Sequence, residues 1–536
     1  MKDYTSIVNS YMKFFCCRLL EYSGIEDSGF YFGSIYSYLK NYDNNMREVV
    51  YELHMPNLYS KNTVDIIVFL NAAIDYLRRK MRKKLLEMDT KERKEIFYIV
   101  AAFQAEFHGR INLVKDGLDL DIGGAHYLEQ NILQLVKNKI YVHEIRGICA
   151  IDKNAIQLIM QECLKTEQLK IDCREYPISI ESFCDVYGCA LTIIELMSKR
   201  SFLQMKMFDS PAIQIDNGNL KFRGTLEYNT EQYVDKFETD MMKYVVSFPK
   251  SIKEILDNNF YKTYGFKIDM VCKIASSQPT WLSSEHLATE SNYATIVGEF
   301  VQTLRCTREE AERIFSYLCI DECKMVENCD FPEKDENRIF EKCILKIDKD
   351  RYLYSQILLG CAYLILERKL MFNLLEECKG INERIIRKKI KEEFVKEMKQ
   401  FIQQYKIKTL SNVYKLDNGK VLSNEVDVMY VMQGTLCIVE CKDVSFRFTP
   451  NGYVTDMMKV YEFVRKMHKK IESVKQNIQY FETVFDQTIK NVEGILVYRT
   501  ANFVTEVMNH DKEIQIVSAS QFKNTFIQVL KNLTLR

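Results

Sequence analysis

Three polar residues late in the chain interrupt two segments that are otherwise apolar. Asp427 lies in the valine-rich run 425–432, and Glu440 and Lys442 end an almost wholly apolar run that starts at residue 435. Both runs are typical of β-strands, and the second is apolar enough for the centre of a sheet. Because burying carboxylates without partners is costly, acids at these positions indicate a site.

A hairpin is expected to bring these residues together. A tight turn at 433–434 lets the two strands pair, so that Asp427 comes close to Glu440. Glu440 and Lys442 are two positions apart on one strand and therefore point to the same face. Two carboxylates there suit Mg²⁺ (or Mn²⁺), a hard cation with oxygen ligands, and the main-chain carbonyl of Cys441 is a further candidate ligand.

This combination of residues predicts phosphodiester hydrolysis. A divalent cation polarises the scissile phosphate and lowers the pKa of a bound water. Lys442 would hold or help to deprotonate that water and offset charge on the phosphate. In an alternative interpretation, Glu440 and Lys442 form an exposed ion pair on a surface hairpin, which would contribute little. The apolar run 435–439 argues against it, because such a run belongs in a sheet centre.

The segments around the three residues predict an α/β domain. A long helix is expected at 382–405, before strands at 413–415, 425–432 and 435–441. A long helix at 453–485, strands at 494–498 and 513–517, and a closing helix at 520–530 follow. Strands that alternate with helices imply a mixed sheet that is covered on both faces.

Asp427, twelve intervening residues and the triplet Glu440-Cys441-Lys442 resemble the D…ExK pattern of the PD-(D/E)XK nuclease superfamily, which includes restriction endonucleases. The resemblance covers residues 381–517. It implies a restriction-endonuclease-like fold and metal-dependent cleavage of DNA, less often RNA. Asp427 and Glu440 would be metal ligands and Lys442 the catalytic lysine. The family's proline before the aspartate is replaced by Val426, a common departure.

The resemblance also suggests residues in the two flanking helices. Family members often place a glutamate in the helix before the sheet, and Glu393 is preferred here over Glu392 and Glu397. The alternative for Glu393 is an ordinary solvated helix residue. In the following helix, Gln476 and Tyr480 resemble the Q-x-x-x-Y motif of RecB-type members, where this pair contacts DNA beside the active site.

Basic residues gather in the same part of the chain. The whole chain has a net charge of zero, but residues 381–536 hold 25 Lys+Arg against 18 Asp+Glu, and the first 380 hold 49 against 56. Arg465, Lys466 and Lys469 lie on the helix after the triplet. They form a candidate phosphate-binding face, with a plain solvated stripe as the alternative.

The chain before residue 381 predicts helices without a recognisable activity. We expect a mainly helical domain over 1–250 with a small hairpin near 213–222, and a small helical, winged-helix-like domain over 251–380. The nuclease domain then covers 381–536. A capping box that starts at Thr307 predicts a helix to Leu318, and 346–354 predicts another hairpin. The basic run 78–84 suggests either a nucleic-acid contact or, preferably, a helix face paired with nearby acids.

Several classes of function are disfavoured by the sequence. A P-loop motif is absent, so an ATPase is not expected. The spacing of Cys319, Cys323 and Cys329 does not fit a zinc ribbon. The apolar runs 64–70 and 357–366 are too short to span a bilayer. The start of the chain does not resemble a signal peptide, and the 17 cysteines are irregularly spaced, so free thiols in a cytoplasmic protein are expected.

We therefore expect a magnesium-dependent endonuclease that acts on DNA, as part of a prokaryotic antiviral defence system. The first 380 residues would recognise DNA, a signal, a partner protein or a second copy of the chain. Two alternatives stay open. One is an RNA-cutting enzyme with the same site. The other is a catalytically inactive nucleic-acid-binding or scaffold protein, against which the intact Asp427, Glu440 and Lys442 argue.

Overall fold

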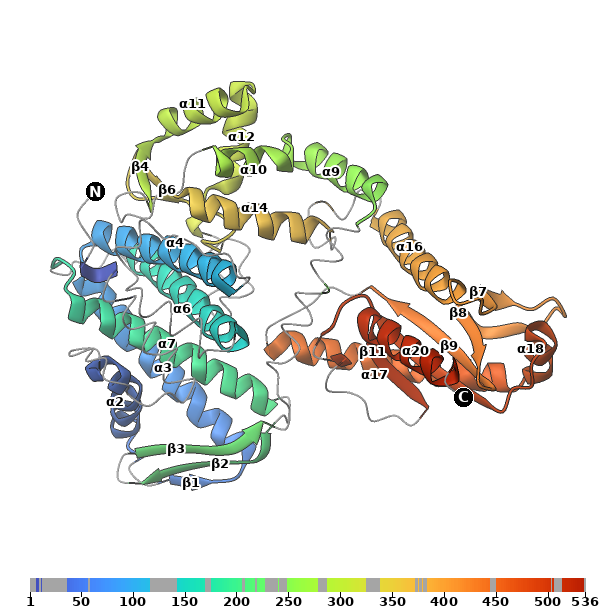
Figure 1. The fold of residues 1–536 in the computed structure, drawn as a ribbon. Helices are drawn as coiled ribbons and strands as arrows, with labels where there is room; N and C mark the ends of the chain where they lie inside the picture. The colour runs from blue at the N-terminus through green and yellow to red at the C-terminus, as the bar shows by residue number, and fades with distance from the viewer. Residues whose placement is uncertain are drawn as a thin grey trace. The chain divides into compact units, whose positions relative to one another are not determined.

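A computed structural model describes residues 6–8, 11, 36–55, 58–115, 142–168, 175–204, 208–216, 219–226, 240, 248–277, 287–323, 338–371, 375, 378, 383–443, 450–502, 504–505 and 513–534. The chain divides into two compact units (Figure 1). The first comprises Met1–Glu227 with Phe260–Arg368, and the second comprises Tyr228–Asn259 with Lys369–Arg536. The three-domain division at residues 250 and 380 stays a prediction.

The first unit is mainly helical, as the sequence predicts. Its early helices are α2 (Tyr36–Glu52), α3 (Thr63–Glu87), α4 (Thr90–Lys115), α6 (Val142–Gln168) and α7 (Ile180–Gln204). Helix α3 packs against α7, and α6 packs against both α4 and α7. The buried residues of α3 recur at helical spacing: Ile66, Phe69, Leu70, Ala73, Ile74, Leu77, Met81 and Leu85.

The hairpin predicted near 213–222 is present. Strand β2 (Phe208–Asp216) pairs antiparallel with β3 (Asn219–Leu226) and with β1 (Leu58–Ser60). In this register Ile213 lies opposite Phe222 and Ile215 opposite Leu220. The turn at 217–218 lies outside the described residues.

The later part of the first unit combines short helices with a small sheet. Its elements are α9 (Lys250–Tyr264, which begins in the second unit), α10 (Ile268–Ser276), β4 (Thr289–Asn292), α11 (Tyr293–Leu304), α12 (Arg308–Leu318), β5 (Ile344–Lys346), β6 (Arg351–Tyr354) and α14 (Gln356–Met371). The antiparallel sheet has the order β4-β6-β5. The predicted hairpin is β5–β6, and the capping box of Thr307 and Glu310 at the start of α12 is confirmed.

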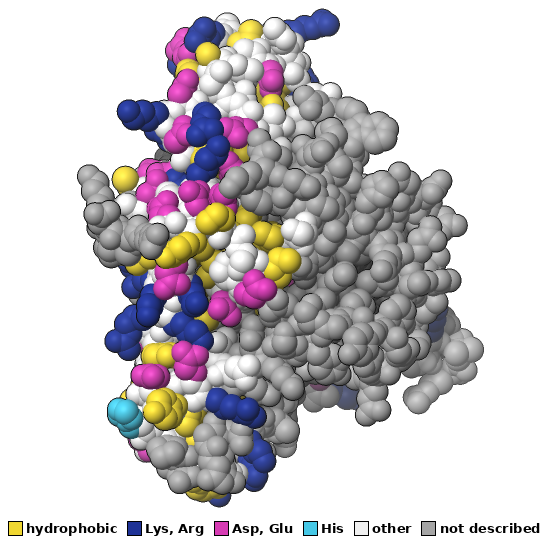
Figure 2. All heavy atoms as spheres, turned by 90° about the vertical axis from the view of Figure 1, so that its left-hand side faces the viewer, with side chains coloured by type: hydrophobic (Ala, Val, Ile, Leu, Met, Phe, Trp, Pro, Cys, Tyr) yellow, Lys and Arg dark blue, Asp and Glu magenta, His cyan; other side chains and the backbone are white. Residues whose placement is uncertain are grey.

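The basic run 78–84 lies on α3 and contacts acids of the same unit. Lys80 pairs with Glu48, and Arg82 pairs with the buried Glu162 of α6. Lys84 Nζ lies 3.7 Å from a carboxylate oxygen of Asp185. Figure 2 shows basic and acidic side chains interspersed on the face it presents. The structure therefore favours the interpretation of this run as a paired helix face.

The second unit contains a mixed five-stranded sheet. Its elements are α16 (Glu383–Gln403), β7 (Thr409–Lys415), β8 (Val421–Met432), β9 (Thr435–Lys442), α17 (Pro450–Lys475), α18 (Ile478–Phe485), β10 (Asn491–Tyr498), β11 (Ile514–Ser518) and α20 (Ala519–Thr534). The strand order is β11-β10-β9-β8-β7. Strands β7, β8 and β9 pair antiparallel, whereas β9, β10 and β11 pair parallel. The predicted mixed α/β class is therefore confirmed.

Both faces of this sheet are covered by helices (Figure 1). Leu436 and Ile438 of β9 belong to a core with buried residues of α17 and α18. Cys437 and Val439 belong to a second core with α16 and α20. Strand β9 lies in the middle of the sheet and is apolar on both sides, which explains its nearly continuous apolar run.

Two sequence predictions need correction. The expected helix 453–485 is two helices, because α17 ends at Lys475 and α18 begins at Ile478. Asn477 has a non-helical backbone (φ −120°, ψ 25°), and its side chain donates to the carbonyl of Ser473 at 2.8 Å. That bond competes with the main-chain ladder and ends the first helix. The strand expected from residue 413 begins earlier, at Thr409.

Among the described residues, each helix is too short or too polar to cross a lipid bilayer.

Candidate active site

Glu440 and Lys442 lie side by side on β9. Alternation along this strand, which puts Leu436 and Ile438 toward α17, also puts Glu440 and Lys442 on that face. Lys442 Nζ lies 2.9 Å from Glu440 Oε1. Both side chains are largely buried, with 16% of Lys442 and 9% of Glu440 exposed. The pair is thus a partly desolvated ion pair in the sheet centre.

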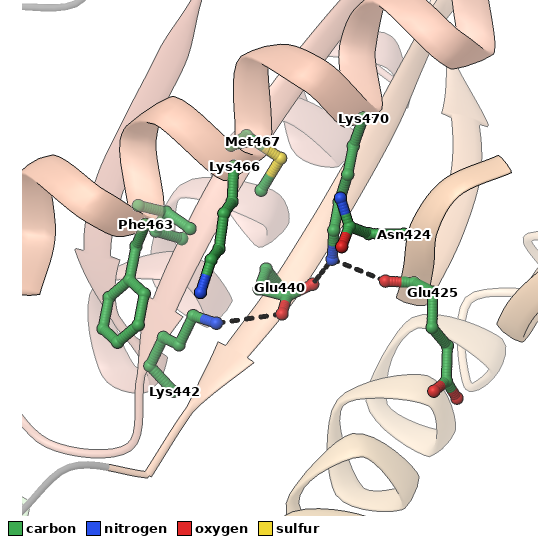
Figure 3. Close-up of a pocket in the computed structure, with 9 residues that line it drawn as sticks. Asn424, Glu425, Glu440, Lys442, Phe463, Lys466, Met467 and Lys470 are labelled. Atoms are coloured by element: carbon green, nitrogen blue, oxygen red, sulfur yellow. Dashed lines mark hydrogen bonds and ion pairs between the residues drawn. The ribbon is translucent and has the colours of Figure 1, made fainter.

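A second lysine reaches Glu440 from helix α17. Lys470 Nζ contacts Glu440 Oε2 and also donates to the main-chain carbonyl of Glu425, at 2.5 Å (Figure 3). Its side chain is 7% exposed. The sequence pattern did not single out Lys470 among the basic residues of this helix. The missed signal is its place on the apolar stripe of α17, three residues after Met467 and four before Val474.

Asp427 lies on the adjacent strand, directly before the last residue of β8 that pairs with β9. Val428 pairs with Val439 in the antiparallel register, and the pairing of the two strands ends there. Asp427 Oδ2 accepts a hydrogen bond from the main-chain N–H of Cys441, with 2.9 Å between oxygen and nitrogen. The residue is only 1% exposed. The hairpin therefore brings Asp427 to the backbone of Cys441, the residue after Glu440.

The alternation of β8 changes at Asp427. Val426 packs in the core on the α17 side, whereas Val428 packs in the core on the α16 side. The side chains of β8 therefore switch faces at Asp427. Its Oδ1 is 2.9 Å from the ammonium of Lys391 on α16. Lys391 lies three residues before the buried Phe394 of α16, and its own side chain is 46% exposed. Helices from both layers thus supply a lysine to this part of the sheet, one for each acid.

The two carboxyl groups differ in proton affinity. Burial raises the pKa of Asp427, and the charge of Glu440 raises it further, against the effects of Lys391 and the Cys441 N–H. Burial also tends to raise the pKa of Glu440, but Lys442 and Lys470 together bring it below its ordinary value. The pKa of Glu440 is therefore lowered and that of Asp427 is raised, each relative to its ordinary value.

A cleft of about 250 Å³ opens over the α17 face of β9. Lys442, Lys466, Lys470, Glu440, Phe463 and Asn424 are among the residues that line it. Figure 3 shows Lys466 directed toward this space and the carboxylate of Glu425 directed away from Glu440. Lys442 Nζ lies 4.2 Å from the centre of the Phe463 ring, a cation–π contact. Three ammonium groups and one inward carboxylate make the cleft suitable for an anion.

The donor set suits a hard divalent cation. The candidate ligands are the carboxylates of Asp427 and Glu440 and the main-chain carbonyl of Cys441. In the described part of the chain, no group of three or more His, Cys, Asp or Glu side chains is arranged to hold a metal ion. Two carboxylates fit Mg²⁺ or Mn²⁺, which keep several waters. Lys391, which is 46% exposed, must move for a cation to reach Asp427 Oδ1.

The structure does not bring Glu393 to Asp427. Its side chain is 48% exposed, and its carboxylate lies 3.9 Å from Lys396. Residues two apart on a helix are separated by about 200°, so Glu393 and Lys391 point to opposite sides of α16. Of the other two glutamates, Glu397 pairs with Lys523, and Glu392 lies 3.7 Å from Lys388.

The residues of the Q-x-x-x-Y motif lie elsewhere as well. Gln476 is exposed in the break between α17 and α18. The Tyr480 hydroxyl donates to Asp417 Oδ2 at 3.1 Å, in the turn between β7 and β8. The motif is therefore not on one continuous helix. Lys470, which precedes Gln476 by about one and a half helical turns, is the residue that contacts Glu440 from α17.

The candidate phosphate-binding residues share α17. Arg465 and Lys469 are exposed. Lys466 lines the cleft, and its ammonium lies 2.6 Å from a carboxylate oxygen of Glu462.

An ion pair beyond the triplet joins β9 to α16. Arg499, just after β10, lies 3.1 Å from Asp443 and donates to the carbonyl of Ile390 at 3.1 Å. Its guanidinium also stacks 4.3 Å from the Phe394 ring. These contacts fix the turn of α16 that carries Lys391. Sequence reasoning did not single out Arg499, because an isolated arginine after a strand has no distinctive pattern.

Comparisons of the chain with models of protein families, with curated proteins and with solved structures find no match. The chemistry of the site itself is therefore the basis for proposing a function.

Proposed function

We propose that the second unit is a nuclease domain of the PD-(D/E)XK type, which hydrolyses phosphodiester bonds with Mg²⁺ or Mn²⁺. The observation that carries the proposal is the position of Glu440 in the central strand, between Lys442 and Lys470, with Asp427 bonded to the main-chain N–H of the next residue, Cys441. Buried acids beside several lysines are costly to maintain for stability alone. Such clusters of perturbed carboxyl groups in a cleft are typical of active sites.

The order of elements supports this proposal. A helix, three antiparallel strands with the acids at the hairpin, a crossover helix and a parallel strand follow one another from α16 to β10. A restriction-endonuclease-like core has this order. The arrangement of the strands and helices thus supports the proposal alongside the residues themselves.

Each charged residue has a distinct task in the proposed reaction. Asp427 and Glu440 would hold the cation, which supplies charge stabilisation for the phosphate and an activated water. Lys442 faces the cleft, where its ammonium would contact a phosphate oxygen and the attacking water. Lys466 would bind a neighbouring phosphate.

DNA is the proposed substrate, and RNA is the alternative for the same site. The surplus of basic residues after residue 380 favours a polyanion of either kind. A role in antiviral defence, and recognition of a signal or partner by the first unit, remain proposals that accompany the nuclease function.

A direct cleavage assay tests the proposal. Full-length protein is incubated with linear, circular and single-stranded DNA and with RNA, in Mg²⁺ or in excess chelator. We expect metal-dependent cutting that Asp427→Ala and Lys442→Ala abolish. Lys475→Met is the control, because Lys475 lies on α17 but pairs with Glu513 away from the cleft. Binding of nucleic acid without cutting would instead identify an inactive binding protein.

A further inference from the structure

Glu440 is contacted by two lysines that differ in how firmly they are fixed. The ammonium of Lys470 contacts Glu440 Oε2 and the carbonyl of Glu425, so it has two anchors on two strands. Lys442 contacts Glu440 Oε1 and the Phe463 ring. Lys470 is the more buried of the two side chains, at 7% exposed against 16%.

These contacts divide the two carboxylate oxygens between two roles. Oε2 faces Lys470, which is also anchored to β8. This oxygen therefore stays bound to Lys470. Oε1 faces a lysine at the cleft whose second contact, among the side chains that the structure describes, is a ring face. A flexible lysine side chain with a single carboxylate partner can exchange that partner at low cost. Oε1 is thus the oxygen that can be released.

We propose that Lys470 is a positioning residue that fixes the orientation of Glu440, so that Oε1 alone is offered to a divalent cation when Lys442 turns toward a phosphate. This inference rests on the proposed nuclease function and extends it to a residue outside the D…ExK pattern. Lys470 joins the carboxylate to the Glu425 carbonyl, and it thereby sets the position of Glu440 relative to the strand that carries Asp427.

The charge balance of the cluster makes the inference measurable. Three ammonium groups, those of Lys391, Lys442 and Lys470, surround the two carboxylates, so the cluster carries a net positive charge. Removing the charge of Lys470 makes the cluster neutral and more attractive to a cation. The same change frees Glu440 to rotate. Cation binding should therefore become tighter while cleavage becomes slower, whereas mere structural damage would weaken both.

The experiment measures Mn²⁺ binding by the electron paramagnetic resonance signal of free Mn²⁺, on full-length protein without nucleic acid. We expect Lys470→Met to bind Mn²⁺ at least about tenfold more tightly than the wild type. Lys470→Arg, which keeps the charge, should stay within about threefold. Lys475→Met, on the same helix but 39% exposed, should match the wild type. If Lys470→Met does not fold, Lys470→Gln carries the test by the same criterion.

Cleavage at saturating Mn²⁺ gives the second readout. We expect at least a hundredfold slower cutting by Lys470→Met, measured at a temperature at which the second unit of the variant is folded. Unchanged or weaker Mn²⁺ binding, or cutting at the wild-type rate, would overturn the inference. A wild type that binds no Mn²⁺ overturns it together with the metal site. A wild type that binds Mn²⁺ but cuts no substrate refutes the nuclease proposal. The Mn²⁺ affinity of Lys470→Met then decides alone whether Lys470 positions Glu440.

Discussion

The carboxylate of Asp427 accepts a hydrogen bond from the main-chain N–H of Cys441, the middle residue of the ExK triplet. The bond links an acid on β8 to the backbone of β9 and fixes the relative position of the two carboxylates. It also means that Asp427 is satisfied by the protein itself, although it is almost wholly buried. Changes at this residue should therefore separate stability from activity.

Asp427→Asn should abolish cutting and slightly stabilise the second unit. The pKa of Asp427 is raised in the folded protein, so its ionised form at neutral pH opposes folding. The amide oxygen can still accept from Cys441. We expect the melting temperature at pH 7 to rise by about 2–4 °C, which corresponds to about 1 kcal/mol. Calorimetry checks this, and the gain should disappear when the pH falls below the ordinary value of 3.8. A lower melting temperature at pH 7 would contradict the assignment.

Glu440→Gln should do the opposite and destabilise the second unit. The change leaves the buried ammonium of Lys470 without its carboxylate, which costs about 3 kcal/mol. Because the folded pKa of Glu440 is lowered, its contribution is present above the ordinary value of 4.5 and lost as the pH falls through the folded pKa. The stability difference between wild type and variant should therefore shrink in acid. Denaturant unfolding at pH 7 and pH 3 measures this difference in stability. A difference that grows in acid would contradict a lowered pKa of Glu440 in the folded protein.

Charge removal on α17 should weaken nucleic-acid binding, whereas charge removal on α12 should not. Arg465 and Lys469 are exposed on the helix beside the cleft. The two arginines of α12 each bond to a glutamate of the same helix, Arg308 to Glu312 at 3.0 Å and Arg313 to Glu309 at 2.5 Å.

The measurement for this comparison is the salt dependence of affinity for a labelled DNA duplex and an RNA of equal length. Each lost phosphate contact should reduce the slope of log K against log salt by about 1. The variant with alanine at Arg465 and Lys469 should show this loss. The variant with alanine at Arg308 and Arg313 should match the wild type. If the α12 variant lost slope and the α17 variant did not, the nucleic-acid-binding surface would lie on the first unit.

Gly494 of β10 should tolerate no side chain. A Cβ built there lies 2.6 Å from Cγ of Met467 and 3.2 Å from Cδ1 of Ile471, both on α17. Gly494→Ala should push α17 away from the sheet, cost about 1–3 kcal/mol and slow cutting by displacing Lys470. Met467→Ala in the same chain should restore part of both losses. Gly298→Ala is the control, since a Cβ there meets no atom within 4 Å. Equal melting temperatures for Gly494→Ala and the wild type would count against this packing.

The strands around the site could be predicted because their burial follows directly from residue type. Residues 435–439 are apolar on both faces, and this pattern has few solutions other than a central strand. The turn at Gln433 and Gly434 has positive φ at both positions (54° and 73°), as the sequence of a tight hairpin turn suggests. The start of β7 at Thr409 could not be predicted, because polar residues leave an edge strand without alternation.

The break after α17 and the two helix lysines were not predicted for a different reason. The apolar stripe continues from Val474 to Phe481, so periodicity gives no sign that Asn477 ends the helix. Lys470 is buried, whereas Lys391 is half-exposed and reaches Asp427 from the edge of the helix contact. Lysines on helices are usually solvated, and a pattern of residue types does not reveal which acid lies opposite them. The partners of Lys391 and Lys470 lie 36 and 30 residues away along the chain and are known only once the sheet is assembled.

The parallel pairing of β9 with β10 has a consequence for synthesis of the protein. Glu440 lies opposite Leu496, and Lys470 comes from the crossover between these strands. A ribosome that has just released the hairpin of β8 and β9 therefore holds every residue of the D…ExK pattern, yet neither the crossover nor the neighbouring strand that complete the pocket. Under the proposed function, a nascent chain would not cut nearby nucleic acid until roughly fifty further residues emerge.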